Sequence, residues 1–239
     1  MDATIQIMSE AVPTFDAVSH GLIHITIPVG MLQCNCSIIG DPVTREALVI
    51  DPGDEVTRIL ELLGRHKLTV KAIVSTHAHI DHVGGLAKLR QYTGAPILMH
   101  RDDLPLYQGM EVQAAFLGVP TPEITEIDQL LKEGDALSWG EFAASVIHTP
   151  GHTPGSVCLY LPKDAGKIAM PVPRLFAGDT LFAGSIGRTD LWGGSMDQIS
   201  HSLKDKLMQL PDDTIVYPGH GALTSIGRER DSNPFLVED

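Results

Sequence analysis

The apolar positions of the chain fall into short runs whose spacing alternates between that of strands and that of helices. Residues 70–75 form an almost continuous apolar run, which is typical of a buried strand, whereas residues 55–66 repeat their apolar side chains at helical intervals. The pattern predicts strands at residues 23–29, 35–39, 47–50, 70–75, 96–99, 142–147, 156–161, 175–177 and 214–217, and helices at residues 55–66, 86–92 and 196–210.

Two stretches between these elements have weaker patterns. Residues 102–132 mix polar and apolar positions and are expected to be helical or loop, and residues 163–174 contain two prolines and are expected to form a loop. The last predicted helix has a clear start, because Ser195 can cap it and Asp197 adds a negative charge to its first turn.

Composition narrows the class of protein. The 239 residues fit one large domain or two small ones, and the 43% of hydrophobic residues are enough for a buried core. The formal charge of −13 (17 − 30) argues against general binding of nucleic acid or of an anionic membrane, since both need a basic surface. The first twenty residues contain no lysine or arginine and no sustained apolar stretch, so we expect no secretory signal and a cytoplasmic protein.

The three cysteines, Cys34, Cys36 and Cys158, are odd in number and include no Cys-x-x-Cys pair, which does not fit a disulfide framework. Cys34 and Cys36 would point to one face of a strand. We expect them to be small core side chains rather than redox or metal-binding groups.

Residues 77–82, His-Ala-His-Ile-Asp-His, place four metal-ligand side chains directly after a predicted buried strand. Burying so many polar groups without partners would be costly, so a core strand explains the run poorly. His77 and His79 can face one metal while Asp81 and His82 turn toward another. The run therefore predicts a metal site.

Three further candidates follow predicted strands in the same way. His152 lies within His-Thr-Pro-Gly-His-Thr-Pro-Gly (residues 148–155), Asp179 within Ala-Gly-Asp-Thr-Leu and His220 within Tyr-Pro-Gly-His-Gly. Alone, His152 and Asp179 also fit ordinary turns. Together with the first run they give five imidazoles and two carboxylates, which is too many for one catalytic zinc ion with three protein ligands and a water. The set suits two metals and hydrolytic chemistry.

The other histidines have no partner motif. His148 lies four residues before His152 and is expected in the core or behind the ligands. Five more are expected to have no functional role: His20, His24, His66, His100 and His201.

In this order the motifs resemble those of the metallo-β-lactamase superfamily and, within it, the hydroxyacylglutathione hydrolases of the glyoxalase II group. The resemblance covers the chain from about residue 23 to the end. It implies an α/β fold, an αβ/βα four-layer sandwich of two mixed β-sheets flanked by helices. It also implies a single domain over residues 1–239, in which residues 1–20 are an N-terminal extension and residues 221–239 a C-terminal tail.

The resemblance assigns the ligands of two divalent metal ions, with zinc favoured and iron or manganese acceptable. One ion would be held by His77, His79 and His152, the other by Asp81, His82 and His220, and Asp179 would bridge both. Asp51 would orient an imidazole or a turn near the ligands. A hydroxide shared by the metals and placed by Asp81 and Asp179 would attack a thioester carbonyl, most simply that of an S-(2-hydroxyacyl)glutathione.

The substrate contacts are less specified. Arg188, in Ser-Ile-Gly-Arg-Thr-Asp, matches a family segment that supplies a basic contact, and we expect it to bind a substrate carboxylate, although an ion pair with Asp190 is the alternative. Arg228 and Arg230 are weaker candidates, for which a solvated tail is favoured. The resemblance is to the short type, since only 19 residues (239 − 220) follow His220, whereas longer members add a helical domain that holds glutathione.

Other activities remain open on the same scaffold. A mononuclear iron persulfide dioxygenase, acting on glutathione persulfide, is the first alternative, and a hydrolase of another ester or a lactone is the second. A nuclease is disfavoured by the negative charge, and a non-enzymatic metal scaffold by the complete ligand set. The sequence leaves the acyl group and the oligomeric state undetermined.

Overall fold

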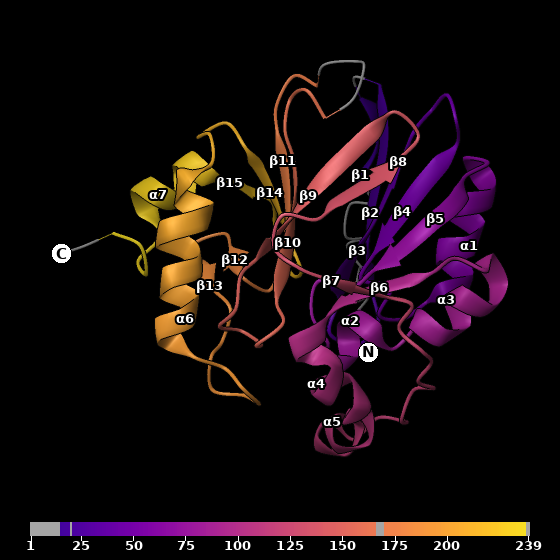
Figure 1. The fold of residues 1–239 in the computed structure, drawn as a ribbon, viewed down its shortest axis with the longest axis horizontal. Coiled ribbons are helices and arrows are strands. Elements are labelled where there is room, and N and C mark those ends of the chain that lie inside the picture. Colours follow the sequence, from indigo (N-terminus) through magenta and orange to yellow (C-terminus); the bar gives the residue numbers. More distant parts are fainter. Residues whose placement is uncertain (1–14, 20, 166–169, 238–239) are drawn as a thin grey trace, which may run out of the picture.

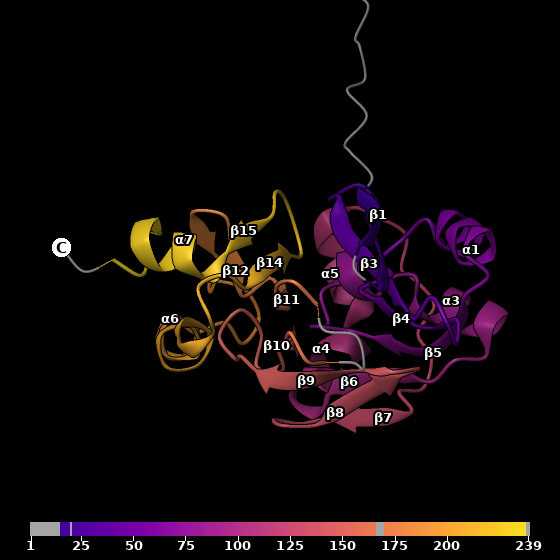
Figure 2. The same cartoon turned by 90° about the horizontal axis from the view of Figure 1, so that it is seen from above.

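The chain folds into two β-sheets packed face to face, with helices on both outer sides (Figures 1 and 2). The structure is a computed structural model that describes residues 15–19, 21–165 and 170–237. No helix within these ranges is both long and apolar enough to cross a membrane.

The first sheet has seven strands in sequence order, with antiparallel pairing from β1 to β4 and parallel pairing from β4 to β7. Its strands are β1 (Phe15–Ser19), β2 (Leu22–Val29), β3 (Cys34–Gly40), β4 (Glu46–Ile50), β5 (Thr69–Val74), β6 (Ile97–His100) and β7 (Gln129–Leu131). The associated helices are α1 (Val56–Arg65), α2 (Ile80–Val83), α3 (Leu86–Thr93), the 3-10 turn η1 (Arg101–Asp103), α4 (Leu104–Gln108) and α5 (Met110–Leu117).

The second sheet has six strands in the order β15-β14-β11-β10-β9-β8, and only the β11–β14 pair is parallel. Its strands are β8 (Ala136–Trp139), β9 (Phe142–His148), β10 (Val157–Leu161), β11 (Arg174–Gly178), β14 (Ile215–Pro218) and β15 (Thr224–Ser225), and β12 (Leu181–Phe182) and β13 (Ser185–Ile186) form a separate hairpin. Helical segments are α6 (Met196–His201), the π-helical turn η2 (Ser202–Lys206), the 3-10 turn η3 (Leu207–Gln209) and α7 (Ile226–Ser232).

Three hydrophobic clusters fill the three spaces between the four layers. One packs the first sheet against α1, α3 and α5, and includes Ile59 and Leu89. The second lies between the sheets and contains the fully buried Trp139. The third packs the second sheet against α6 and α7, through Ile199 and Ile226. The expected four-layer α/β sandwich of two mixed sheets is therefore confirmed.

Every strand and helix that the hydrophobic pattern predicts is present, with ends that agree to within one residue. Residues 196–209 form one continuous helical segment, α6 through η3, and Ser195 caps it by accepting a hydrogen bond from the Gln198 amide. The described residues of the predicted loop 163–174 lie outside strands until Arg174 begins β11.

Both predicted chain ends need correction. Residues 1–14 and 20 lie outside the described part, but β1 pairs with β2 along its whole length, so residues 15–19 belong to the first sheet. The predicted tail is also wrong, because β15 and α7 complete the second half of the sandwich. The buried Glu229 holds this segment by accepting hydrogen bonds from the Gly184 amide and from the Asn233 side chain.

Candidate metal centre

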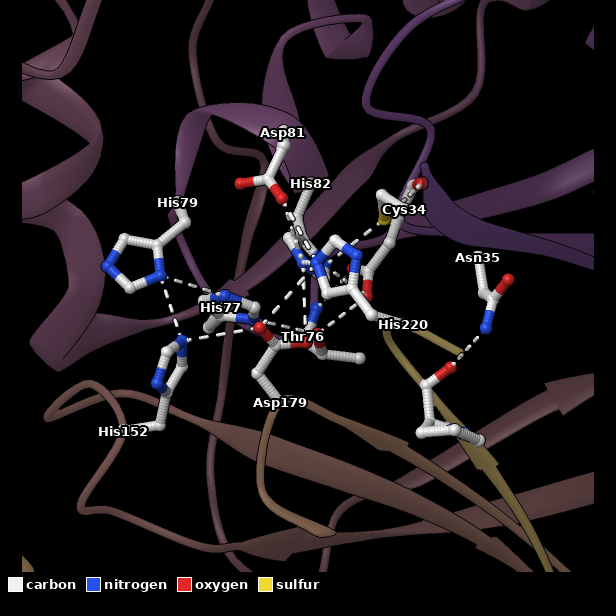
Figure 3. Close-up of polar contacts among 12 residues, drawn as sticks. Cys34, Asn35, Thr76, His77, His79, Asp81, His82, His152, Asp179 and His220 are labelled. Atoms are coloured by element: carbon white, nitrogen blue, oxygen red, sulfur yellow. Dashed lines mark hydrogen bonds and ion pairs between the residues drawn. The ribbon is translucent and has the colours of Figure 1, made fainter. Parts of the chain in front are cut away.

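The seven predicted ligands converge in one place, where the loops at the carboxyl ends of strands meet (Figure 3). His77 follows β5, and His79 begins the single turn of α2, which carries Asp81 and His82. The other three follow strands β9, β11 and β14 and are His152, Asp179 and His220. The placement expected from the sequence is confirmed.

Three imidazoles form the first group. His79 Nδ1 lies 3.1 Å from His77 Nε2 and 2.9 Å from His152 Nε2. Nitrogens bound tetrahedrally to a zinc ion, with bonds of about 2.0–2.1 Å, are themselves separated by about 3.3 Å. The spacing within this group thus matches one coordination shell, and the three side chains form a candidate metal site.

The second group contains Asp81, His82 and His220. His220 Nε2 lies 3.2 Å from His82 Nε2 and 3.1 Å from Asp81 Oδ2. Asp179 lies between the groups, since its Oδ1 is 3.4 Å from His82 Nε2 while its Oδ2 is 3.6 Å from His152 Nε2. Asp179 thus has a carboxylate oxygen near an imidazole of each group, and it also forms a candidate ligand set with His77 and His82.

The outer nitrogens of the imidazoles decide which atom faces the centre. His152 Nδ1 lies 2.8 Å from the Arg188 carbonyl oxygen and His220 Nδ1 lies 3.0 Å from that of Leu32. A carbonyl only accepts, so each Nδ1 carries the proton and each Nε2 turns a lone pair inward. His82 follows the same rule, because its Nδ1 lies 3.0 Å from a carboxylate oxygen of Asp51.

Inward lone pairs at such short distances repel one another unless a cation lies between them. One buried oxygen of the centre, Asp179 Oδ1, also has no hydrogen-bond partner among the described residues. The donor set of imidazole nitrogen and carboxylate oxygen is one that zinc, iron and manganese accept. The residues therefore fit a metal centre.

Asp51 holds the ligands from behind. Its carboxylate accepts hydrogen bonds from the Thr76 amide at 2.7 Å and the Thr76 hydroxyl at 2.6 Å, besides that of His82. The Thr76 hydroxyl in turn lies 3.1 Å from His77 Nδ1. One buried carboxylate thus orients an imidazole of each group, which is the usual way in which ligand histidines are fixed.

Close backbone approach explains two of the glycines. A Cβ atom on Gly219 would lie 2.1 Å from Asp179 Oδ1 and 2.8 Å from His82 Cε1. A Cβ atom on Gly53 would lie 1.5 Å from the carbonyl oxygen of Asp81. Larger residues at these positions would push the ligand loops apart.

Two positioning residues were missed by the sequence analysis. The buried carboxylate of Asp103 accepts hydrogen bonds from the Ala78 amide, the Thr153 hydroxyl and the Gly155 amide at 2.6–2.8 Å, which ties the two histidine loops together. The buried Gln113 amide binds the backbone on both sides of His79, at Ala78 and Ile80. Both lie in residues 102–132, where no spacing connects them to the histidine motifs.

The charges differ between the two groups. Burial lowers the pKa of His77 and His152, and lowers that of His79 to about 3, so these rings are neutral and able to bind a cation at neutral pH. Burial opposes ionisation of Asp81, but the neighbouring His82 and the hydrogen bond with His220 hold its pKa below the usual range. The second group thus contributes an ionised carboxylate.

Two cysteines, one histidine and one arginine that were singled out in the sequence are packed into the fold. Cys34 and Cys36 are buried in the first hydrophobic cluster, as expected, and burial raises the pKa of the Cys34 thiol to about 12. His24 is fully buried with its Nδ1 3.0 Å from an Arg174 guanidinium nitrogen, which makes it a core residue. Arg230 is only partly exposed and is held against the fold, because it donates to the carbonyl oxygens of Met208 and Leu210.

His148 stacks on His100, with ring centroids 4.0 Å apart and an angle of 14° between the rings. Asp102 lies beside them, so the three could be taken for another metal site. However, an imidazole lone pair lies in the plane of its ring, and two nearly parallel rings cannot direct lone pairs at one ion. His148 instead holds the turn that carries His152, through its Nε2 contact of 2.9 Å with the Pro154 carbonyl oxygen.

The metal centre opens into a cavity of about 300 Å³. Arg188 lines this cavity, but its guanidinium is held in two hydrogen bonds, of 2.7 and 2.8 Å, by the carboxylate of Asp190. Both side chains are more than half exposed, so the pair is easily separated by a competing carboxylate.

The ligand motifs, their order and the four-layer sandwich can be compared with known proteins. A family model described as the metallo-β-lactamase superfamily matches residues 29–220, which include all seven predicted ligands. The chain belongs to the metallo-β-lactamase superfamily. This makes it a member of a superfamily of metal-dependent hydrolases, in agreement with its His/Asp cluster.

Two relatives match this chain over nearly their whole length. An uncharacterized protein of Aquifex aeolicus is 43% identical over 218 residues, covering 89% of this chain and 96% of the relative. A hydroxyacylglutathione hydrolase, GloC of Haemophilus influenzae, is 38% identical over 212 residues, covering 88% and 96%.

Solved structures show the same fold. The BLEG-1 B3 metallo-β-lactamase has a TM-score of 0.80 and 39% identity, covering 89% of this chain and 99% of its own. TTHA1623 in a di-iron-bound form has a TM-score of 0.76 and 38% identity, with coverages of 88% and 99%. ETHE1 from Myxococcus xanthus has a TM-score of 0.72 and 29% identity, with coverages of 89% and 83%.

Proposed function

We propose that the protein is a cytoplasmic, metal-dependent hydrolase that cleaves a thioester, most simply an S-(2-hydroxyacyl)glutathione. The observation that carries this proposal is the convergence of five imidazoles and two carboxylates, with their lone pairs turned toward each other, at the floor of an open cavity. The 38% identity to a hydroxyacylglutathione hydrolase supports the choice of substrate.

In this proposal the two groups hold two divalent ions. His77, His79 and His152 bind the first, Asp81, His82 and His220 bind the second, and Asp179 binds both. Zinc is favoured, and the likeness to a di-iron-bound structure supports iron as an alternative.

Divalent cations bound there would supply a hydroxide nucleophile near neutral pH, because they lower the pKa of water toward about 7, and would polarise the scissile carbonyl. The carboxylates of Asp81 and Asp179 line the same cavity, where they can accept a hydrogen bond from the attacking water and orient it. A thiol leaving group has a pKa near about 8.5, so it can depart as the thiolate without a general acid.

Arg188 is proposed to bind a carboxylate of the substrate in exchange for Asp190. We expect Arg188→Met to raise KM for lactoylglutathione about tenfold with little change in kcat, because the contact is made equally in the ground and transition states. Lys163→Met removes a cation that is paired with Asp213 outside the cavity and is the matched control. An unchanged KM for the Arg188 variant would show that Arg188 does not bind the substrate and only pairs with Asp190.

The alternative is an iron-dependent dioxygenase acting on glutathione persulfide, and the likeness to ETHE1 is compatible with it. Metal-quantified protein should be given lactoylglutathione and, separately, glutathione persulfide in an oxygen electrode. The proposal predicts loss of the thioester without oxygen uptake. Oxygen uptake with persulfide at one iron per chain, and no thioester cleavage, would replace the hydrolase by the dioxygenase.

A further inference from the structure

A second hollow adjoins the cavity of the metal centre. It has a volume of about 410 Å³, within the range of small-molecule sites, and lies against α4 and α5. Pro105, Leu106 and Val112 form one wall and Pro154 another. We refer to this space as the apolar hollow.

Two side chains line both the apolar hollow and the cavity of the metal centre, namely Gln113 and Trp192. Gln113 is fixed there, because its amide also donates to the Leu106 carbonyl oxygen. The Trp192 indole stands edge-on to His79, at a centroid distance of 6.2 Å, and to Phe116 at 5.6 Å. The hollow therefore begins directly beside a predicted metal ligand.

The chemistry of the walls distinguishes this hollow from its neighbours. Asp102 is the one charged residue among those that line it in the described part of the chain. A third hollow of about 330 Å³ shares Asp81 with the cavity of the metal centre, but two carboxylates line it, those of Asp54 and Asp81. Hydrocarbon bound next to the metals is thus best accommodated on the side of Trp192.

We infer that the apolar hollow binds the hydrocarbon part of the acyl group, so that the preferred substrates are thioesters with an extended apolar acyl chain. This inference rests on the proposed thioester hydrolysis and specifies its substrate class. A carbonyl carbon at the metal centre leaves the acyl chain free to pass Trp192. Each methylene buried there improves kcat/KM up to about fourfold, until the hollow is full.

The test compares lactoyl-, butyryl- and octanoylglutathione, each below its micelle concentration, with metal-loaded protein. We expect kcat/KM to rise from butyryl to octanoyl by at least tenfold. Val112→Asp places a carboxylate on the wall of the hollow, and should lower the ratio of octanoyl to lactoyl kcat/KM at least tenfold. Trp192→Ala removes the aromatic side chain that lines both spaces and should lower the same ratio.

Val43→Asp is the matched control, because Val43 is 75% exposed and lies in the turn between β3 and β4. It should leave the ratio unchanged. Equal rates for all three thioesters, or a Val112 variant that keeps the wild-type ratio, would overturn the inference while leaving thioester hydrolysis intact. A second copy of the chain that covers the hollow would also leave the ratio of octanoyl to lactoyl kcat/KM unchanged by Val112→Asp, and would overturn the inference. Sedimentation would reveal that case as a dimer that Val112→Asp dissociates. Failure to cleave any thioester would instead overturn the proposed function.

Discussion

Replacing Asp179 with asparagine is expected to remove most of the bound metal and to lower the hydrolytic rate by about a hundred- to a thousandfold. The substituted amide would keep the shape of the side chain but lose the negative charge that faces both ligand groups. Its NH2 group would also point at a cation or at the neighbouring imidazoles, whose nitrogens lie 3.4–3.7 Å from the native carboxylate. Both effects disfavour a pair of divalent ions.

The measurement is the metal-to-protein ratio by mass spectrometry together with kcat/KM for a cleaved thioester. Asp197→Asn, an identical change at an exposed position in the first turn of α6, should alter neither value. If the Asp179 variant kept both its metal content and its rate, Asp179 would not be a metal ligand.

The second large effect is expected for Asp51→Asn. The backbone at this position has a φ of 51°, a conformation that asparagine tolerates better than most residues, so the substitution chiefly tests the charge. An amide can accept only part of the three hydrogen bonds that the carboxylate accepts, and one donor of Thr76 or His82 is left unsatisfied. We expect a loss of about 1–3 kcal/mol in the free energy of unfolding and a ten- to hundredfold weaker metal affinity.

Chemical unfolding of the metal-free protein and a competition titration with a chelator separate these two effects. Asp54→Asn, three residues later and exposed, is the control. Wild-type metal affinity in a stably folded Asp51 variant would show that the orientation of His77 and His82 does not depend on Asp51.

The sequence predicted the site best where a clear strand pattern is followed directly by side chains that can bind a metal. An almost continuous apolar run predicts β5. The predicted ligands His77 and His79 follow it, because a strand end is where the backbone can turn polar groups into a crevice. The edge strands of both sheets were not predicted. They are β1 and β7 in the first sheet and β8 and β15 in the second, and β7 lies in the stretch 102–132 that was expected to be helical or loop. These strands are two to five residues long and gain their order from pairing with their neighbours rather than from their own pattern.

Residues that act through long-range contacts could not be found in this way. Asp103 and Gln113 are polar, lie in a stretch with no clear periodicity, and become buried only because the histidine loops supply their hydrogen-bond partners. The C-terminal helix α7 was not predicted for the same reason. Glu229 is a surface residue by type, yet it is fully buried because Asn233 and Gly184 bond to it. Such networks are properties of the folded chain, and only the structure reveals them.

The central claim is that the converging lone pairs hold two metal ions. Anomalous diffraction from crystals grown with excess zinc tests it directly. The account predicts two peaks about 3.5–4 Å apart, one beside the nitrogens of His77, His79 and His152 and the other beside His82 and His220, with Asp179 between them. A single peak under these conditions, or imidazoles that turn away from one another, would contradict it.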